Sequence, residues 1–195
     1  EPAMRHLIDT YIRADDSEVI SHLDDISLID LVESKGASAL DDLPPASTRK
    51  RDNAADAIEN NVRKLIVEES PVNPRFYEKM SDLLTDLIRQ RREDAIDYAE
   101  YLERIADLVR AAKAGHGGDY PDTIITAGQK ALYDNLGNDE ALTLRVDSTV
   151  RETAPFGWRG NRMRERKVWR CLQQIFDDAD DLERVFEILK NQNEY

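Results

Sequence analysis

The part of the sequence best suited to binding chemistry is a basic stretch near its end. Residues 156–176 carry six basic side chains, and Glu165 is their only acid. Arginine forms planar, bidentate contacts with phosphates and carboxylates, so this stretch could hold phosphates or an acidic partner. An internal alternative stays open, because the acidic residues 177–183 could neutralise it if the last two helices pair. The candidate contact residues are Trp158, Arg159, Arg162, Arg164, Arg166, Lys167 and Arg170.

Few other side chains could bind a metal or act as a nucleophile. His6, His22 and His116 are the only histidines, and none lies four residues from another, as a helical zinc site requires. We expect His116 to be a solvated loop residue. Cys171 is the only cysteine, which excludes an internal disulfide and fits a reducing compartment. It falls on an apolar helical stripe, which predicts a buried structural thiol.

Catalytic motifs are equally scarce. No glycine-rich phosphate loop of the Walker type is present, so the chain alone should not hydrolyse ATP. Asp122 and the later Glu165-Arg166-Lys167 form the skeleton of a metal-dependent nuclease signature. That chemistry gathers its carboxylates and lysine around Mg²⁺, typically from neighbouring strands, whereas Glu165 lies in a helical pattern. We therefore predict no catalytic, cofactor-binding or metal-binding residue in this chain.

The elements that would position these residues are helices. Apolar residues recur at helical spacing almost everywhere, and no long stretch alternates with period two. Asn73 can cap a helix over 74–92 that begins at Pro74, and a second helix over 98–113 follows after a short break. The pattern predicts an all-α fold, a multi-helix bundle built around this long antiparallel hairpin.

Two regions are expected along the chain. Residues 1–70 read as an amino-terminal helical subdomain, with an exposed linker near 44–51, where two prolines precede polar and basic residues. Residues 71–195 read as a carboxy-terminal helical bundle, in which Thr126 can cap one helix and residues 139–153 form another. The two regions could also form one continuous domain.

The net charge and the first residues of the chain indicate where the protein is found and which partners it avoids. The 195 residues carry a net charge of −13, so the chain as a whole should be repelled by nucleic acid and anionic membranes. No apolar run approaches the roughly 18 residues of a membrane span. The chain opens at Glu1-Pro2 without a charged and apolar leader. We expect a cytoplasmic segment cut from a larger protein.

Five strings in order along the chain carry a family resemblance. They are ENNVRKLI (59–66), NPRFYEKMSDLL (73–84), ALYDNL (131–136), GWRGN (157–161) and LKNQNEY (189–195). Together they resemble the carboxy-terminal helical region of the R subunit of type I restriction-modification enzymes. The resemblance covers nearly the whole chain, from Met4 to Tyr195.

The resemblance implies a function for the parent protein and for this part of it. Such a parent is a type I site-specific deoxyribonuclease whose nuclease and RecA-like motor domains use ATP and Mg²⁺ to translocate DNA. Its carboxy-terminal region is expected to attach that motor to the modification (methyltransferase) and specificity subunits. The family's Walker lysine, DEAD-type acids and nuclease acids have no matching positions here, so none is carried over.

The sequence and the resemblance leave three candidate functions. The first is a docking domain that binds the methyltransferase–specificity core. The second is a DNA guide, in which the basic 156–170 stretch tracks duplex leaving the motor, although the net charge counts against it. The third is an intramolecular brace for the motor domains.

Overall fold

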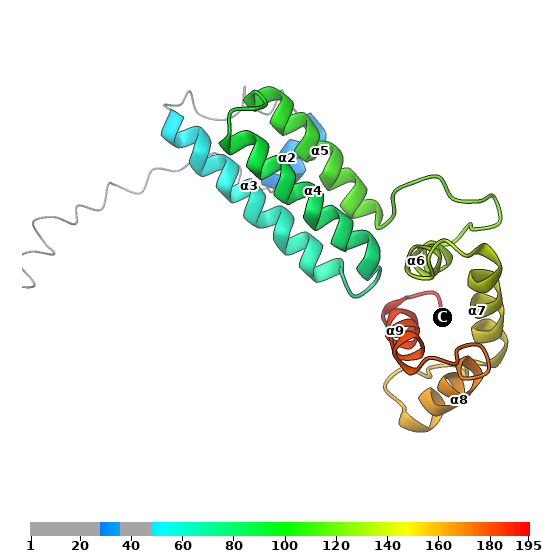
Figure 1. Ribbon diagram of the computed structural model, residues 1–195. Coiled ribbons are helices and arrows are strands. Elements are labelled where there is room, and N and C mark those ends of the chain that lie inside the picture. The colour runs from blue at the N-terminus through cyan, green and yellow to red at the C-terminus, as the bar shows by residue number, and fades with distance from the viewer. Residues whose placement is uncertain (1–27, 36–47) are drawn as a thin grey trace, which may run out of the picture.

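All regular elements in the described part of the chain are helices, which confirms the expected all-α fold class. The computed structural model describes residues 28–35 and 48–195, and within them it has eight helices and no strand. Figure 1 shows two groups of helices, α2–α5 and α6–α9. The helices are α2 (Leu28–Lys35), α3 (Thr48–Glu69), α4 (Pro74–Arg92), α5 (Tyr98–Ala114), α6 (Ala127–Asn135), α7 (Glu140–Thr153), α8 (Arg162–Leu172) and α9 (Ala179–Asn191).

The helices α4 and α5 form an antiparallel hairpin. Asn73 caps α4 by accepting a hydrogen bond from the backbone N–H of Phe76, and α5 ends at Gly115 with φ 71°. At one end of the pair the Tyr77 hydroxyl donates to the carbonyl of Ala112 at 2.8 Å. At the other end Arg104 Nη1 donates to Gln90 Oε1 at 2.9 Å. Residues early in α4 therefore lie beside residues late in α5.

The helix α3 completes the core of the first bundle. Glu59, only 4% exposed, lies 2.9 Å from Arg91 of α4 and accepts a hydrogen bond from the Tyr101 hydroxyl of α5 at 3.2 Å. A buried carboxylate is tolerated only when it is paired in this way. The helix α2 lies against α5, where Lys113 contacts Asp30 at 2.6 Å.

The two hydrophobic cores do not divide at residue 70, where the domain boundary was expected. Buried residues from α3, α4 and α5 form one hydrophobic cluster that spans residues 55–112, so the turn at 70–73 joins neighbours within a bundle. Residues 48–51 of the expected linker near 44–51 belong to α3. Residues 44–47 and most of the amino-terminal subdomain lie outside the described residues.

The helices α6–α9 share a second core. The hairpin does not enter it, so the bundle predicted for 71–195 is divided between two cores. Thr126 caps α6, as predicted, and forms a capping box with Gln129; Asp139 caps α7. The buried residues of this core are Ala131, Leu132, Val146, Val150, Trp158, Val168, Leu172, Phe176, Leu182, Val185, Phe186, Ile188 and Leu189.

The last residues of the chain close the second bundle. The Glu194 carboxylate accepts hydrogen bonds from the N–H groups of Ala127 and Gly128 at 3.1 and 3.2 Å, at the first turn of α6. The Tyr195 hydroxyl donates to Asp147 Oδ1 on α7 at 2.7 Å. A β-carbon at Gly128 would lie 2.8 Å from the Tyr195 ring, so the close approach of the tail requires glycine there.

Polar side chains join the two bundles. Asn73 Nδ2 donates to Asp134 at 2.8 Å, and Asn135 Nδ2 donates to Asn73 Oδ1 at 2.8 Å. Gln192, beyond α9, donates to the carbonyl of Val72 at 2.6 Å. Figure 1 shows the turn between α3 and α4 beside α6 and α9, as these contacts require. A buried side-chain amide that loses its hydrogen-bond partner destabilises the fold. These amides therefore favour the one arrangement of the two bundles in which all of them are paired.

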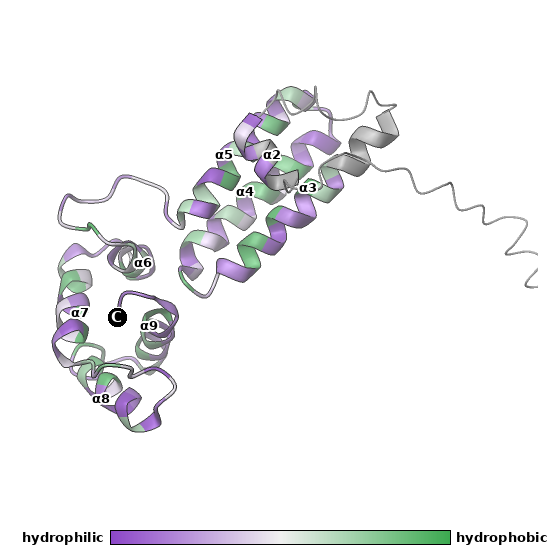
Figure 2. Cartoon of the chain, turned by 180° about the vertical axis from the view of Figure 1, so that it is seen from behind, coloured by the Kyte–Doolittle hydropathy of each residue, from purple (hydrophilic) through white to green (hydrophobic). Residues whose placement is uncertain are grey.

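The helices are amphipathic. In Figure 2 they carry both green hydrophobic and purple hydrophilic segments. In the part of the chain that the structure describes, no helix has both the length and the apolarity to cross a membrane.

Candidate interaction surface

The basic stretch lies on α8 and the loop that leads into it. Asn161 caps the helix by accepting hydrogen bonds from the N–H groups of Met163 and Arg164 at 3.1 and 3.2 Å. Glu165 accepts one from the N–H of Gly160 at 2.8 Å. These contacts fix the loop against the first turn of α8.

Trp158 is not a surface residue, which corrects its place in the predicted contact set. Its side chain is 2% exposed, and its ring lies 5.7 Å from that of Phe186 on α9. The Trp169 ring meets the same Phe186 edge to face at 5.2 Å. Trp158 therefore anchors the loop in the second core, where no partner can reach it.

Arg159 is also occupied within the chain. Its guanidinium donates to the carbonyls of Leu189 at 3.3 Å, Lys190 at 2.9 Å and Gln192. These carbonyls belong to the end of α9, where helix groups lack partners and a cation is favoured. Partial burial lowers the pKa of Arg159. Arg159 caps α9 and holds the tail, and it is not a free contact residue.

The other five predicted contact residues are exposed. Arg164 Nη1 donates to the carbonyls of Phe156 at 2.6 Å and Gly157 at 3.3 Å. The other four have no hydrogen bond or ion pair with any residue that the structure describes. They are Arg162, Arg166, Lys167 and Arg170.

The acidic residues 177–183 do not neutralise these cations through ion pairs. Asp178 accepts from the N–H groups of Asp180 and Asp181 and caps α9. Asp181 pairs with Arg184 of its own helix at 2.7 Å. Among the described residues, no acid of this turn pairs with a cation of α8, so the internal alternative loses its expected contacts.

Two apolar side chains that the sequence reading passed over lie beside these cations. Phe156 is 99% exposed and Met163 is 72% exposed. Phe156 lies between Pro155 and Gly157, outside any helical apolar stripe, and this position was the signal that could have revealed it. We call Phe156, Met163 and the five exposed cations Arg162, Arg164, Arg166, Lys167 and Arg170 the α8 surface.

A shallow groove adjoins the α8 surface. It has a volume of about 190 Å³ and lies where α8 meets α9. Arg162, Glu165 and Arg166 border it, and the rings of Trp169 and Phe186 form its apolar wall. An apolar wall bordered by guanidinium groups suits a protein side chain of mixed polarity.

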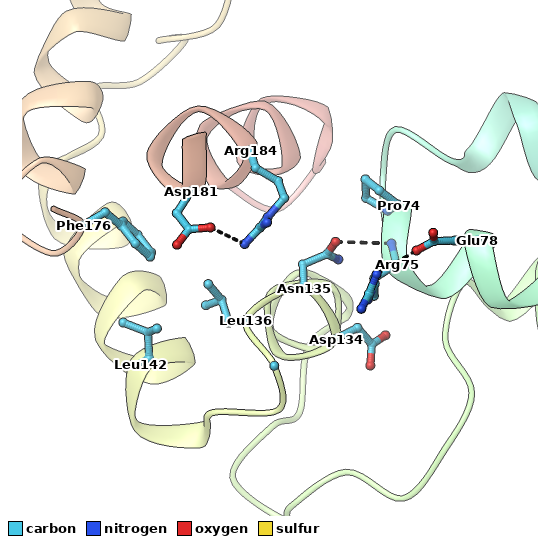
Figure 3. A pocket seen from close by; sticks show the side chains of 11 residues that line it. Pro74, Arg75, Glu78, Asp134, Asn135, Leu136, Leu142, Phe176, Asp181 and Arg184 are labelled. Atoms are coloured by element: carbon cyan, nitrogen blue, oxygen red, sulfur yellow. Dashed lines mark hydrogen bonds and ion pairs between the residues drawn. The ribbon is translucent and has the colours of Figure 1, made fainter. Parts of the chain in front are cut away.

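A larger hollow of about 610 Å³ lies between the two bundles (Figure 3). Its arginines are both paired, Arg75 with Glu78 at 2.9 Å and Arg184 with Asp181 at 2.7 Å. Asn135 Oδ1 accepts from the N–H of Arg75 at 3.2 Å, and Figure 3 shows this contact spanning α4 and α6. The hollow thus offers no unpaired cation, in contrast to the α8 surface.

No protein-family model, curated protein or solved structure matches this chain. Its function is therefore inferred from its own residues.

The other candidates for chemistry are the cysteine, the histidines and the acids of the nuclease-like signature. Cys171 is half-buried, so it is less enclosed than predicted. Glu165 lies on α8 and Asp122 in the loop before α6, and the described residues hold no cluster of three potential metal ligands. His6 and His22 lie outside the described residues.

His116 is half-buried, which corrects the expectation of a solvated loop residue. Its ring meets Tyr120 edge to face at 6.0 Å, and its Nε2 lies 3.2 Å from Lys130 Nζ. Burial and the nearby Lys130 lower the pKa of His116, so it favours the neutral form.

Proposed function

We propose that this chain is a non-catalytic helical docking domain of a type I restriction endonuclease R subunit. It attaches the ATP-dependent DNA translocase and nuclease of its parent to the methyltransferase–specificity core. The nuclease and ATPase chemistry, with its ATP and Mg²⁺, belongs to other parts of a cytoplasmic parent protein. The assignment to this enzyme class rests on the five strings that resemble it.

The observation that favours docking is the α8 surface. Four of its cations have no partner among the described residues, and two large apolar side chains lie exposed beside them. A docking domain presents such a surface to the methyltransferase–specificity core, whereas an intramolecular brace would have it covered by the motor domains of the parent chain. The buried junction between the bundles, with Asn73 and Gln192, supports a rigid module that presents it.

A binding experiment tests the proposal. The tagged chain is mixed with the assembled modification and specificity subunits, and complex formation is measured by analytical ultracentrifugation. The full-length R subunit is the positive control. We expect one copy of this chain to bind at each site on the core that the full-length R subunit occupies. If the full subunit binds and this chain does not, the docking function is wrong.

A DNA guide is the second candidate, because unpaired arginines on one helix suit phosphate contacts. It now depends on Arg162, Arg164, Arg166 and Arg170, since Trp158 and Arg159 are used within the chain. Their contacts would make the logarithm of the affinity for duplex fall with the logarithm of the salt concentration, with a slope of about −0.9 for each phosphate neutralised. Titration of duplex at two salt concentrations measures that slope, and no binding at low salt excludes the guide.

A further inference from the structure

We propose that Phe156 and Met163 are the apolar anchors of the α8 surface, and that they enter an apolar socket bordered by carboxylates on a partner protein. The inference deepens the proposed function and rests on it for the identity of the partner, the methyltransferase–specificity core.

Phe156 is held in an exposed position by contacts of its own carbonyl and of the residues that follow it. Arg164 donates to its carbonyl at 2.6 Å, and Gly157 then takes a left-handed φ of 62°. Next along the chain, Trp158 is buried in the core and Arg159 is bonded to the end of α9. The loop is therefore fixed before any partner arrives, so binding need not order it.

Leaving these side chains in water has a cost that a partner would remove. Burying a phenylalanine or methionine side chain is favourable in water because apolar surface leaves the solvent. The other large exposed apolar residues of the described chain are on other elements, Val67 on α3, Leu83 on α4 and Ile125 before α6. Only the α8 surface places two of them within one loop and the helix turn that follows it.

The charges around the anchors define the partner. Arg162, Arg166, Lys167 and Arg170 are exposed and have no acidic partner among the described residues. An approaching surface must therefore supply the carboxylates, and like charges there would be repelled. Phenylalanine, methionine and arginine at the centre of a contact are typical of protein interfaces.

A protein fits these features better than a nucleic acid. Phosphates would pair with the cations but give no burial to Phe156 or Met163. The chain also has a net charge of −13, which repels a polyanion beyond the immediate contact. An acidic protein surface with an apolar socket uses both the cations and the anchors.

The test compares two double variants in the full-length protein that carries this chain. Phe156→Ala with Met163→Ala removes the anchors, and Val67→Ala with Leu83→Ala is the matched control on the first bundle. Affinity for the modification–specificity core is measured by calorimetry. Circular dichroism and urea unfolding check that each variant is folded.

We expect the anchor variant to bind at least tenfold more weakly and the control to bind as the unchanged protein does. Arg166→Glu with Lys167→Glu should slow association, most strongly at low salt. If the anchor variant binds normally, or loses no more than the control, the inference is wrong while the docking function stands. If the unchanged protein does not bind the core, both are wrong.

Two further measurements separate other occupants. If the anchor variant binds the core normally while charge reversal abolishes binding to duplex DNA, the surface is a nucleic-acid site and the inference is overturned. If light scattering shows a dimer that only the anchor variant loses, the occupant is a second copy of this chain, which also overturns it.

Discussion

Removing the hydroxyl of Tyr195 should destabilise the second bundle, although the residue is the last in the chain. Tyr195→Phe keeps the ring, which packs against the core and lies 5.0 Å from the Arg151 guanidinium. It removes the 2.7 Å hydrogen bond to the buried carboxylate of Asp147. That carboxylate keeps Gln129 and Arg151, both at 2.9 Å, so it is not left unpaired.

The magnitude follows from the kind of bond that is lost. A hydrogen bond to a charged group contributes about 1.5–3 kcal/mol, and the two remaining partners of Asp147 place the cost near the lower end, about 1.5 kcal/mol. With a urea dependence of about 2 kcal/mol per molar, the unfolding midpoint should fall by about 0.7 M.

Tryptophan fluorescence is a suitable assay for this change. Trp158 and Trp169 are the only tryptophans, and both contact the second core, so their signal reports on the bundle that Tyr195 closes. Tyr133→Phe is the matched control, because the Tyr133 hydroxyl bonds to no described residue. If Tyr195→Phe changes the free energy of unfolding by less than about 0.5 kcal/mol, like a neutral surface substitution, the tail does not stabilise the bundle as argued.

Three further outcomes are expected. Trp158→Ala should cost about 3–5 kcal/mol by urea unfolding, whereas Phe156→Ala should stay within about 0.5 kcal/mol; equal effects would contradict their assignment to core and surface. Gly128→Ala should cost about 1–3 kcal/mol by displacing the tail, and adding Tyr195→Phe should then cost little more; full additivity would contradict the contact. Burial raises the pKa of Tyr77 to about 12, so its neutral form stabilises the fold below its unfolded pKa of about 10. That contribution should be lost as the pH rises from about 10 to 12, so the free energy of unfolding should fall over this range. In Tyr77→Phe the fall should be smaller. If the free energy of unfolding depends on pH equally steeply in both proteins, the raised pKa of Tyr77 is wrong.

The helices themselves were predictable because their signals are local. Each helix cap bonds to backbone N–H groups within the first turn of its own helix. The caps are Asn73, which precedes Pro74, Thr126, which lies three residues before Gln129, and Asp139. The apolar stripes have the 3.6-residue period whatever the stripe finally packs against. These interactions span a few residues, so a single sequence contains all of their partners.

The division into bundles was not predictable in the same way. Ser70-Pro71 ends a helix in the sequence, but it does not show whether the next helix continues the same core. In the structure, Glu59 of α3 meets Arg91 of α4 and Tyr101 of α5, so the break is a turn within one bundle. Such pairings join residues more than thirty positions apart, and helical periodicity carries no information about them.

The α8 surface shows the same limit at the level of side chains. From the sequence alone, residues 156–176 are a basic stretch with two tryptophans, and that much is local. Which of its members face solvent depends on where α9 lies. The tertiary structure buries Trp158 against Phe186, directs Arg159 to the carbonyls that end α9, and leaves Phe156 exposed. Composition determined the charge of the surface, and the packing of a helix from farther along the chain decided which residues belong to it.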